Sequence, residues 1–203
     1  MKWHDCDNKL QKSGFKVFSN REFQGISGAS AVASKFMLMR YTNKGLLCRL
    51  KRDLYQCTNR MASPWLIANQ LYKPSYLSLE SALSYYGLIP ESVYSVTSVT
   101  TKTTRGFEAG NHLYSYRTIK ASAFGGYRSV MIADEQIMMA EREKALADYL
   151  YFVFLKKIVL NERLSFTDVK KRRLHDYLLL FERPDLEEWY RHDFKISDHR
   201  IAR

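Results

Sequence analysis

The first regular pattern of apolar and polar positions begins at Ser19. Ser19 and Glu22 have the spacing of a capping box, in which each side chain accepts a hydrogen bond from the other residue's backbone N–H. This spacing predicts a short helix that runs through Gln24 and stops at Gly25, because glycine commonly follows the last helical turn. Residues 25–28, Gly-Ile-Ser-Gly, then predict a turn.

A second helical pattern begins near residue 30 and ends at residue 43 or 44, directly before Gly45. Its apolar residues recur at helical spacing and are expected to face the core: Val32, Phe36 and Met39. Its polar residues away from that stripe are expected on the outer surface: Ser30, Ser34 and Lys35. Gly45 is expected to end the helix, because glycine takes a left-handed backbone conformation at little cost.

Two short apolar stretches, residues 46–50 and 54–57, surround the charged tip Lys51-Arg52-Asp53 and predict a β-hairpin. The order helix, turn, helix, hairpin is that of a winged helix-turn-helix, and we expect such a domain over residues 1–60. Its second helix would enter the major groove of DNA, and the cations of the hairpin tip would meet phosphates or the minor groove. The alternative is that the hairpin is a plain structural ribbon.

Positive charge is concentrated in the same segment. Of the net +11, residues 1–60 carry +8, from 12 Lys and Arg against 4 Asp and Glu, and residues 61–203 carry the remaining +3. A basic segment beside a nearly neutral one favours a polyanion-binding domain attached to a body with another task. The expected DNA contacts are cations and small polar residues of the second helix and the hairpin: Ser30, Ser34, Lys35, Arg40, Arg49, Lys51 and Arg52.

Residues 61–203 show both strand and helix patterns and predict a mixed domain. Helices are expected over residues 63–71, from residue 78, from residue 141, and over residues 167–181 and 184–192. Strands are expected over residues 93–101, 112–119, 129–133 and 136–139. The whole chain is therefore expected to be α+β, a winged helix-turn-helix followed by a mostly antiparallel sheet of about four strands and C-terminal helices.

The sequence contains no motif that points to catalysis, metal binding or membrane insertion. The longest apolar run, residues 149–155, is too short to span a bilayer. The five histidines are scattered and no CxxC or HExxH spacing occurs, so neither a metal nor another cofactor is expected. The three cysteines favour reduced thiols in the cytoplasm. The basic run 170–173 is interpreted as a solvated helix face, with a phosphate or partner contact as the alternative.

Four segments together carry a resemblance to a known family. They are residues 45–55, with Gly-Leu-Leu and Arg-Leu-Lys-Arg; residues 76–83, Tyr-Leu-Ser-Leu-Glu-Ser-Ala-Leu; residues 96–102, Val-Thr-Ser-Val-Thr-Thr-Lys; and residues 139–148, Met-Ala-Glu-Arg-Glu-Lys-Ala-Leu-Ala-Asp. Over about residues 18–155, the chain resembles the AbiEi antitoxins of bacterial abortive-infection toxin–antitoxin systems.

The chain departs from that family at two positions. Asp53 stands where the family usually has Gly in the hairpin turn, and Arg142 stands where the family has Pro before Glu-Lys-Ala-Leu. Aspartate tolerates a left-handed backbone better than most residues, so the turn is expected to form. Arginine at position 142 removes a preference for starting a helix without preventing one.

The resemblance implies a function as antitoxin and transcriptional autorepressor. The winged helix would bind inverted repeats in promoter DNA, where two copies could act as a homodimer. The C-terminal domain, residues 61–203, would counter a nucleotidyltransferase-like toxin from the same operon. In many of these systems, classed as type IV, neutralisation needs no stable complex between toxin and antitoxin.

Two other functions stay open. The winged helix could be a docking platform for another protein, with exposed aromatic side chains such as Tyr85, Tyr86 and Tyr94 as anchors, although a core position is the default for each. The chain could also be an enzyme whose site the sequence does not reveal, which we do not expect.

Overall fold

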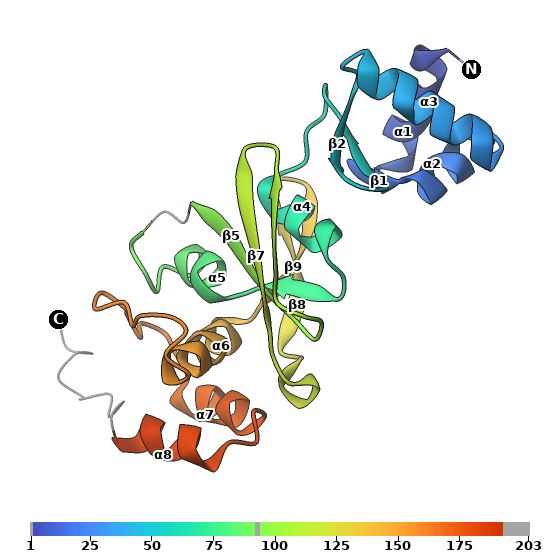
Figure 1. The fold of residues 1–203 in the computed structure, drawn as a ribbon. Helices are drawn as coiled ribbons and strands as arrows, with labels where there is room; N and C mark the ends of the chain where they lie inside the picture. The colour runs from blue at the N-terminus through green and yellow to red at the C-terminus, as the bar shows by residue number, and fades with distance from the viewer. Residues whose placement is uncertain (1, 92–93, 193–203) are drawn as a thin grey trace. The chain divides into compact units, whose positions relative to one another are not determined.

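The computed structural model describes residues 2–91 and 94–192, and over these residues the chain is α+β, as expected. It has mixed sheets in which antiparallel pairs predominate (Figure 1). The chain divides into two compact units. The N-terminal unit extends through Leu71 and includes residues 109–111, and the sheet unit holds the other described residues.

The N-terminal unit combines helices with a small three-stranded sheet (Figure 1). Its elements are α1 (Trp3–Ser13), β1 (Val17–Ser19), α2 (Asn20–Ser27), α3 (Ala31–Asn43), β2 (Leu47–Lys51), β3 (Leu54–Cys57) and α4 (Pro64–Leu71). The strand order is β1-β3-β2, and both pairings are antiparallel. The hairpin expected over residues 46–57 is therefore present, with β1 added as a third strand that the sequence pattern did not reveal.

The capping box at the start of α2 is confirmed. Ser19 Oγ accepts a hydrogen bond from Glu22 N (3.2 Å), and Ser19 N donates to Glu22 Oε2 (2.6 Å). The expected stop at Gly25 is wrong, because α2 continues to Ser27 and ends at Gly28, whose φ is 70°. Another helical turn forms because Phe23 and Ser27, four residues apart, are both buried on one face.

The face of α3 that packs inward is opposite to the expected one. The apolar residues expected in the core are exposed instead: Val32 (65 %), Phe36 (62 %) and Met39 (54 %). The residues that are buried are Ser34, Met37, Leu38 and Tyr41. Both sets have helical spacing, and the buried set packs on side chains from α1, α2 and the small sheet, among them Leu10, Phe18, Phe23 and Leu47.

The sheet unit is built on a six-stranded sheet, where about four strands were expected. Its elements are β4 (Ser75–Leu77), α5 (Leu79–Tyr85), β5 (Ser95–Thr100), β6 (Arg105–Ala109), β7 (His112–Thr118), the 3₁₀ helix η1 (Ala121–Ala123), β8 (Tyr127–Ile132), β9 (Glu135–Ala140), α6 (Arg142–Phe154), α7 (Lys171–Leu179) and α8 (Pro184–His192). The strand order is β6-β7-β5-β4-β9-β8, with β5–β7 and β4–β9 parallel. Residue 93, where a strand was expected to begin, lies outside the described residues.

Helices α6, α7 and α8 pack on one another (Figure 1). Helix α6 begins after Glu141, as expected, and the side chains from Glu143 to Phe152 are all buried. Helix α7 is shorter than the expected span of residues 167–181, because Asp168 takes a left-handed φ of 57° that interrupts a helix before it. Helix α8 begins at Pro184, as expected.

Candidate nucleic-acid interface

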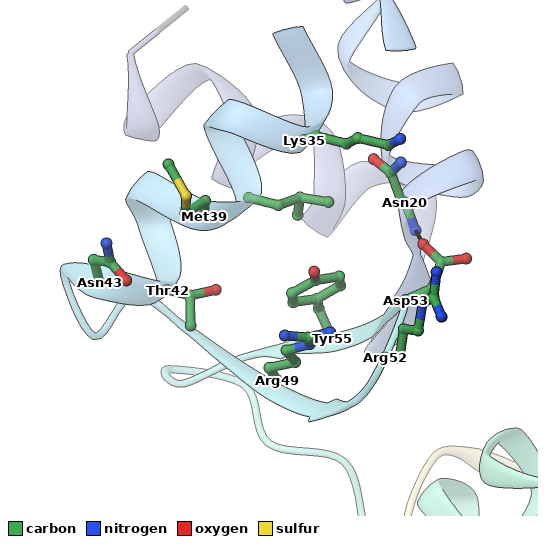
Figure 2. Close-up of a pocket in the computed structure, with 10 residues that line it drawn as sticks. Asn20, Lys35, Met39, Thr42, Asn43, Arg49, Arg52, Asp53 and Tyr55 are labelled. Atoms are coloured by element: carbon green, nitrogen blue, oxygen red, sulfur yellow. Dashed lines mark hydrogen bonds between the residues drawn. The ribbon is translucent and has the colours of Figure 1, made fainter. Parts of the chain in front are cut away.

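A hollow of about 540 Å³, here called the hairpin hollow, lies between α3 and the β2–β3 hairpin (Figure 2). Its lining residues come from α2, α3 and the hairpin: Asn20, Lys35, Leu38, Met39, Thr42, Asn43, Arg49, Arg52, Asp53 and Tyr55. Figure 2 shows Lys35 and Met39 on α3 across the hollow from Arg49, Arg52 and Tyr55 on the hairpin.

The tip of the hairpin is held in place by Asp53. Its φ is 62°, so Asp53 adopts the left-handed conformation that the turn was expected to need. Asp53 Oδ1 also accepts a hydrogen bond from Asn20 N (3.2 Å), which ties the tip to the start of α2. Leu50 and Leu54 on either side of the tip are buried. The hairpin therefore presents Arg52 from a fixed turn rather than from a loose loop.

The structure brings together three of the expected contact residues, Lys35, Arg49 and Arg52, whose side chains are exposed and line the hairpin hollow. Arg49 Nε donates a hydrogen bond to Lys51 O (3.2 Å), which orients its guanidinium. Asp53 is the one acid among the described lining residues, so the hollow carries a positive excess. This excess is what a phosphate-rich ligand requires.

Two other expected contact residues, Ser34 and Lys51, form hydrogen bonds within the N-terminal unit. Ser34 is fully buried, and its Oγ donates to Asn20 Oδ1 (2.9 Å), so it cannot reach a ligand. The expectation for Ser34 failed because the inward face of α3 was assigned to the wrong row. Lys51 is half-buried, and its Nζ donates to the carbonyl oxygen of Leu71 at the end of α4.

Ser30 and Arg40 lie on the surface of α3 but away from the hairpin hollow. Ser30 is the N-cap, and its Oγ accepts a hydrogen bond from Ala33 N (3.2 Å). Arg40 lines a second hollow of about 280 Å³ on the other flank of α3, with Lys2 and Lys44 as further cations. Helix α3 therefore has cations on both flanks.

The outermost positions of α3 form one line along the helix, here called the outward row: Val32, Phe36, Met39 and Asn43. The first three are the exposed apolar residues and Asn43 is an exposed amide. Sequence reasoning missed this row, and it missed the lining residues Asn20, Asn43 and Tyr55 and the flanking Lys2 and Lys44. For Lys44, the signal was its position four residues after Arg40 on a helical pattern.

Two cysteines of the N-terminal unit, Cys6 and Cys57, are buried. Cys6 Sγ lies 3.7 Å from Tyr41 Oη in the core, and burial raises the pKa of the Cys6 thiol. Burial also raises the pKa of the Cys57 thiol. A raised pKa keeps a thiol protonated and therefore a poor nucleophile.

The sheet unit contains a polar cluster that the sequence did not reveal, formed by Tyr76, Ser78, Lys144 and Asp148. Lys144 Nζ lies 2.5 Å from Asp148 Oδ1, and both side chains are fully buried. Asp148 Oδ2 accepts hydrogen bonds from Ser78 Oγ (2.7 Å) and Tyr76 Oη (3.3 Å). Burial raises the pKa of Asp148, while the Lys144 ammonium and the two hydroxyls act to lower it. Because all four side chains are buried, the cluster is part of the core of the sheet unit.

The basic run 170–173 is partly neutralised. Arg173 forms an ion pair with Glu141, which also accepts a hydrogen bond from Tyr177 Oη (2.6 Å). Nearby, Arg142 Nη1 lies 3.4 Å from Asp168 Oδ2. Together with other charged residues these groups line a hollow of about 250 Å³ that contains both acids and bases. The ion pair with Glu141 offsets the charge of Arg173, at the end of the run.

The three tyrosines considered as anchors differ in exposure. Tyr94 is 96 % exposed. Tyr85 is partly exposed, and its ring meets that of Tyr86 edge-on at 5.0 Å. Tyr86 is half-buried and donates a hydrogen bond to Ala140 O (2.9 Å). Tyr94 is therefore the most exposed of the three.

Within the described part of the chain, no three His, Cys, Asp or Glu side chains gather as metal ligands. No helix of residues 2–91 and 94–192 has the length and apolar character needed to cross a membrane. No protein-family model and no curated protein matches this chain.

Proposed function

We propose that the N-terminal unit is a winged helix-turn-helix that binds double-stranded DNA in the cytoplasm. The observation that carries the proposal is the setting of α3. It follows α2 after a turn at residues 28–30, its outward row is exposed, and cations lie on both of its flanks. A second helix of this kind is the one that enters the major groove in helix-turn-helix proteins.

In this arrangement the two flanks of α3 face the two phosphate strands that border the groove. Lys35, Arg49 and Arg52 around the hairpin hollow would meet one strand. Arg40 and Lys44 on the other flank would meet the second. Phosphate contacts from cations supply affinity and orientation and leave sequence selection to the residues between them.

The test is the salt dependence of binding to the DNA that precedes the protein's own coding sequence. The double variant Arg49→Ala/Arg52→Ala should reduce the slope of log K against log salt by about 2, since each lost phosphate contact removes about 1. The matched control Lys157→Ala/Arg172→Ala removes the same charge from exposed positions of the sheet unit and should keep the parent's slope. Equal slopes for the two double variants would refute the proposal that the hairpin contacts DNA.

We further propose that the protein is an antitoxin and autorepressor, with promoter DNA and a nucleotidyltransferase-like toxin as its partners. The resemblance to the AbiEi antitoxins supports this. Two of the segments that carry it, residues 76–83 and 139–148, meet through the hydrogen bond between Ser78 and Asp148. Because that contact is buried, these two segments stabilise the core of the sheet unit. A surface that opposes the toxin would lie on exposed residues elsewhere in the sheet unit.

Co-expression tests this second part. The chain should restore growth of cells that express the neighbouring gene of its operon, and the Arg49→Ala/Arg52→Ala variant should restore it equally while losing repression of a promoter reporter. Failure of the parent chain to restore growth would refute the antitoxin proposal and leave DNA binding to be judged by its own test.

A second candidate function is a docking platform for another protein. The exposed apolar side chains Val32, Phe36 and Met39 favour it, because apolar residues gathered on one surface commonly mark a contact with a partner. A docking platform would bind no DNA at any salt concentration. It would lose its partner on Phe36→Ala and keep it on Arg49→Ala/Arg52→Ala.

A further inference from the structure

The outward row of α3 has an unusual composition for the surface of a basic domain. Val32, Phe36 and Met39 are more than half exposed, and none of them belongs to the core of the N-terminal unit. The cations of α3 lie on its flanks, in the two hollows, and not in this row. The middle of the row therefore has no donor for the acceptor edge of a guanine, which Arg or Lys usually contacts.

The chemistry of the row matches the major-groove edge of an A·T base pair. Thymine presents a 5-methyl group there, which apolar side chains contact, and adenine presents N6 and N7, to which Asn can bind with two hydrogen bonds. Val32, Phe36 and Met39 supply the apolar contacts, and the exposed Asn43 supplies the amide. At 1.5 Å per residue, Val32 to Met39 spans about 10 Å, the rise of about three base pairs.

We infer that the outward row selects A·T base pairs in the major groove, with Phe36 and its neighbours reading thymine methyl groups and Asn43 reading adenine. This inference rests on the proposed DNA binding and specifies its sequence class. The flanking cations fix the helix between the two phosphate strands, so that the apolar row faces the base edges. Selectivity then arises from burying methyl groups against the row rather than from charge.

The test uses a duplex selected by the 203-residue chain from a random-sequence library. The selected site should be rich in A·T pairs. Replacing its thymines with deoxyuridine removes only the 5-methyl groups and should weaken binding about fourfold for each contacted methyl. The salt slope should not change, because no charge is altered.

In Phe36→Ala, replacing thymine with deoxyuridine should weaken binding less than it does in the parent, since the methyl group would already have lost its partner. Phe15→Ala, which truncates a partly exposed phenylalanine in the same unit, should leave that loss unchanged. Arg49→Ala/Arg52→Ala should lower the salt slope and keep the loss on thymine replacement. Thermal unfolding of each variant checks that the fold is intact.

Two outcomes separate this inference from the proposed function. A selected site rich in G·C pairs, or equal affinity for the thymine and deoxyuridine duplexes, would overturn the inference while salt-dependent binding upheld the proposed function. Absence of binding to every duplex in the library at low salt would overturn both.

Discussion

Breaking the buried ion pair between Lys144 and Asp148 should strongly destabilise the sheet unit. The variant Lys144→Met keeps an unbranched apolar side chain as far as the ε position and removes the ammonium. Asp148 would then be buried with Ser78 Oγ (2.7 Å) and Tyr76 Oη (3.3 Å) as hydrogen-bond donors and without its counter-charge. Removing one partner of a fully buried pair costs about 3–5 kcal/mol.

The loss should depend on pH in a defined direction. Burial already raises the pKa of Asp148, and Lys144 acts to lower it, so Lys144→Met raises that pKa further. A carboxyl group whose folded pKa lies above the unfolded value of about 3.9 stabilises the fold fully below that pH. This contribution is lost as pH rises through the folded pKa. The deficit of Lys144→Met should therefore be smallest near pH 4 and grow as the pH is raised.

Urea unfolding followed by hydrogen exchange measures the effect in each unit separately. Peptides from α6 should become less protected in Lys144→Met, while peptides from α3 serve as an internal reference. The matched control is Arg191→Met, which breaks another pair at i,i+4 spacing, with Glu187, but at a 64 % exposed arginine. Such an exposed pair contributes about 0.3–0.5 kcal/mol. A loss in Lys144→Met no larger than in Arg191→Met would refute the argument.

Two further predictions concern backbone geometry and helix capping. Gly45→Ala should lower the unfolding free energy by about 1–2 kcal/mol, because φ is 68° but a Cβ would meet open space. Gly126→Ala should lower it more, because its Cβ would lie 2.5 Å from the ring of Tyr177. Equal urea midpoints for the two variants would contradict this order. Ser19→Ala removes the acceptor for Glu22 N and should lower the unfolding free energy of the N-terminal unit by about 1 kcal/mol; an unchanged urea midpoint would show that the capping box does not stabilise α2.

The sequence predicted best those features that neighbouring residues determine. The capping box at Ser19, the glycine at position 45 and the proline at position 184 each act on backbone groups within a few residues, so their signals are local. The left-handed turn at Asp53 belongs to the same group. Three-residue strands are different, because β1 and β4 exist only through partners far along the chain, such as Ser19 with Leu54 and Leu77 with Met139.

The inward face of α3 could not be read from its pattern, because the helix carries apolar residues on two sides. The row of Val32, Phe36 and Met39 has the same helical spacing as the row of Met37, Leu38 and Tyr41. Which row is buried depends on which side of the helix packs against α1, α2 and the small sheet. The residues of α3 themselves do not indicate that side.

Within the candidate site, the sequence predicted correctly only those residues whose charge keeps them on the surface. Lys35, Arg49 and Arg52 lie around the hairpin hollow because exposed cations on a helix and its neighbouring hairpin can hardly face inward. Ser34 is buried rather than exposed, and both Ser34 and Lys51 have partners that the sequence does not show. Those partners, the Asn20 side chain and the Leu71 carbonyl, are brought near by tertiary packing.

The long-range contacts of the sheet unit also set the order in which a growing chain can fold on the ribosome. The N-terminal unit holds almost all of its residues within the first 71, so it can close early. Strand β4 and the start of α5 must wait for β9 and α6, because Leu77 pairs with Met139 and Ser78 bonds to Asp148. At about 5–20 residues per second, the ribosome needs about 4–14 s to cover that interval. During this time β4 and the start of α5 lack the partners that β9 and α6 later supply.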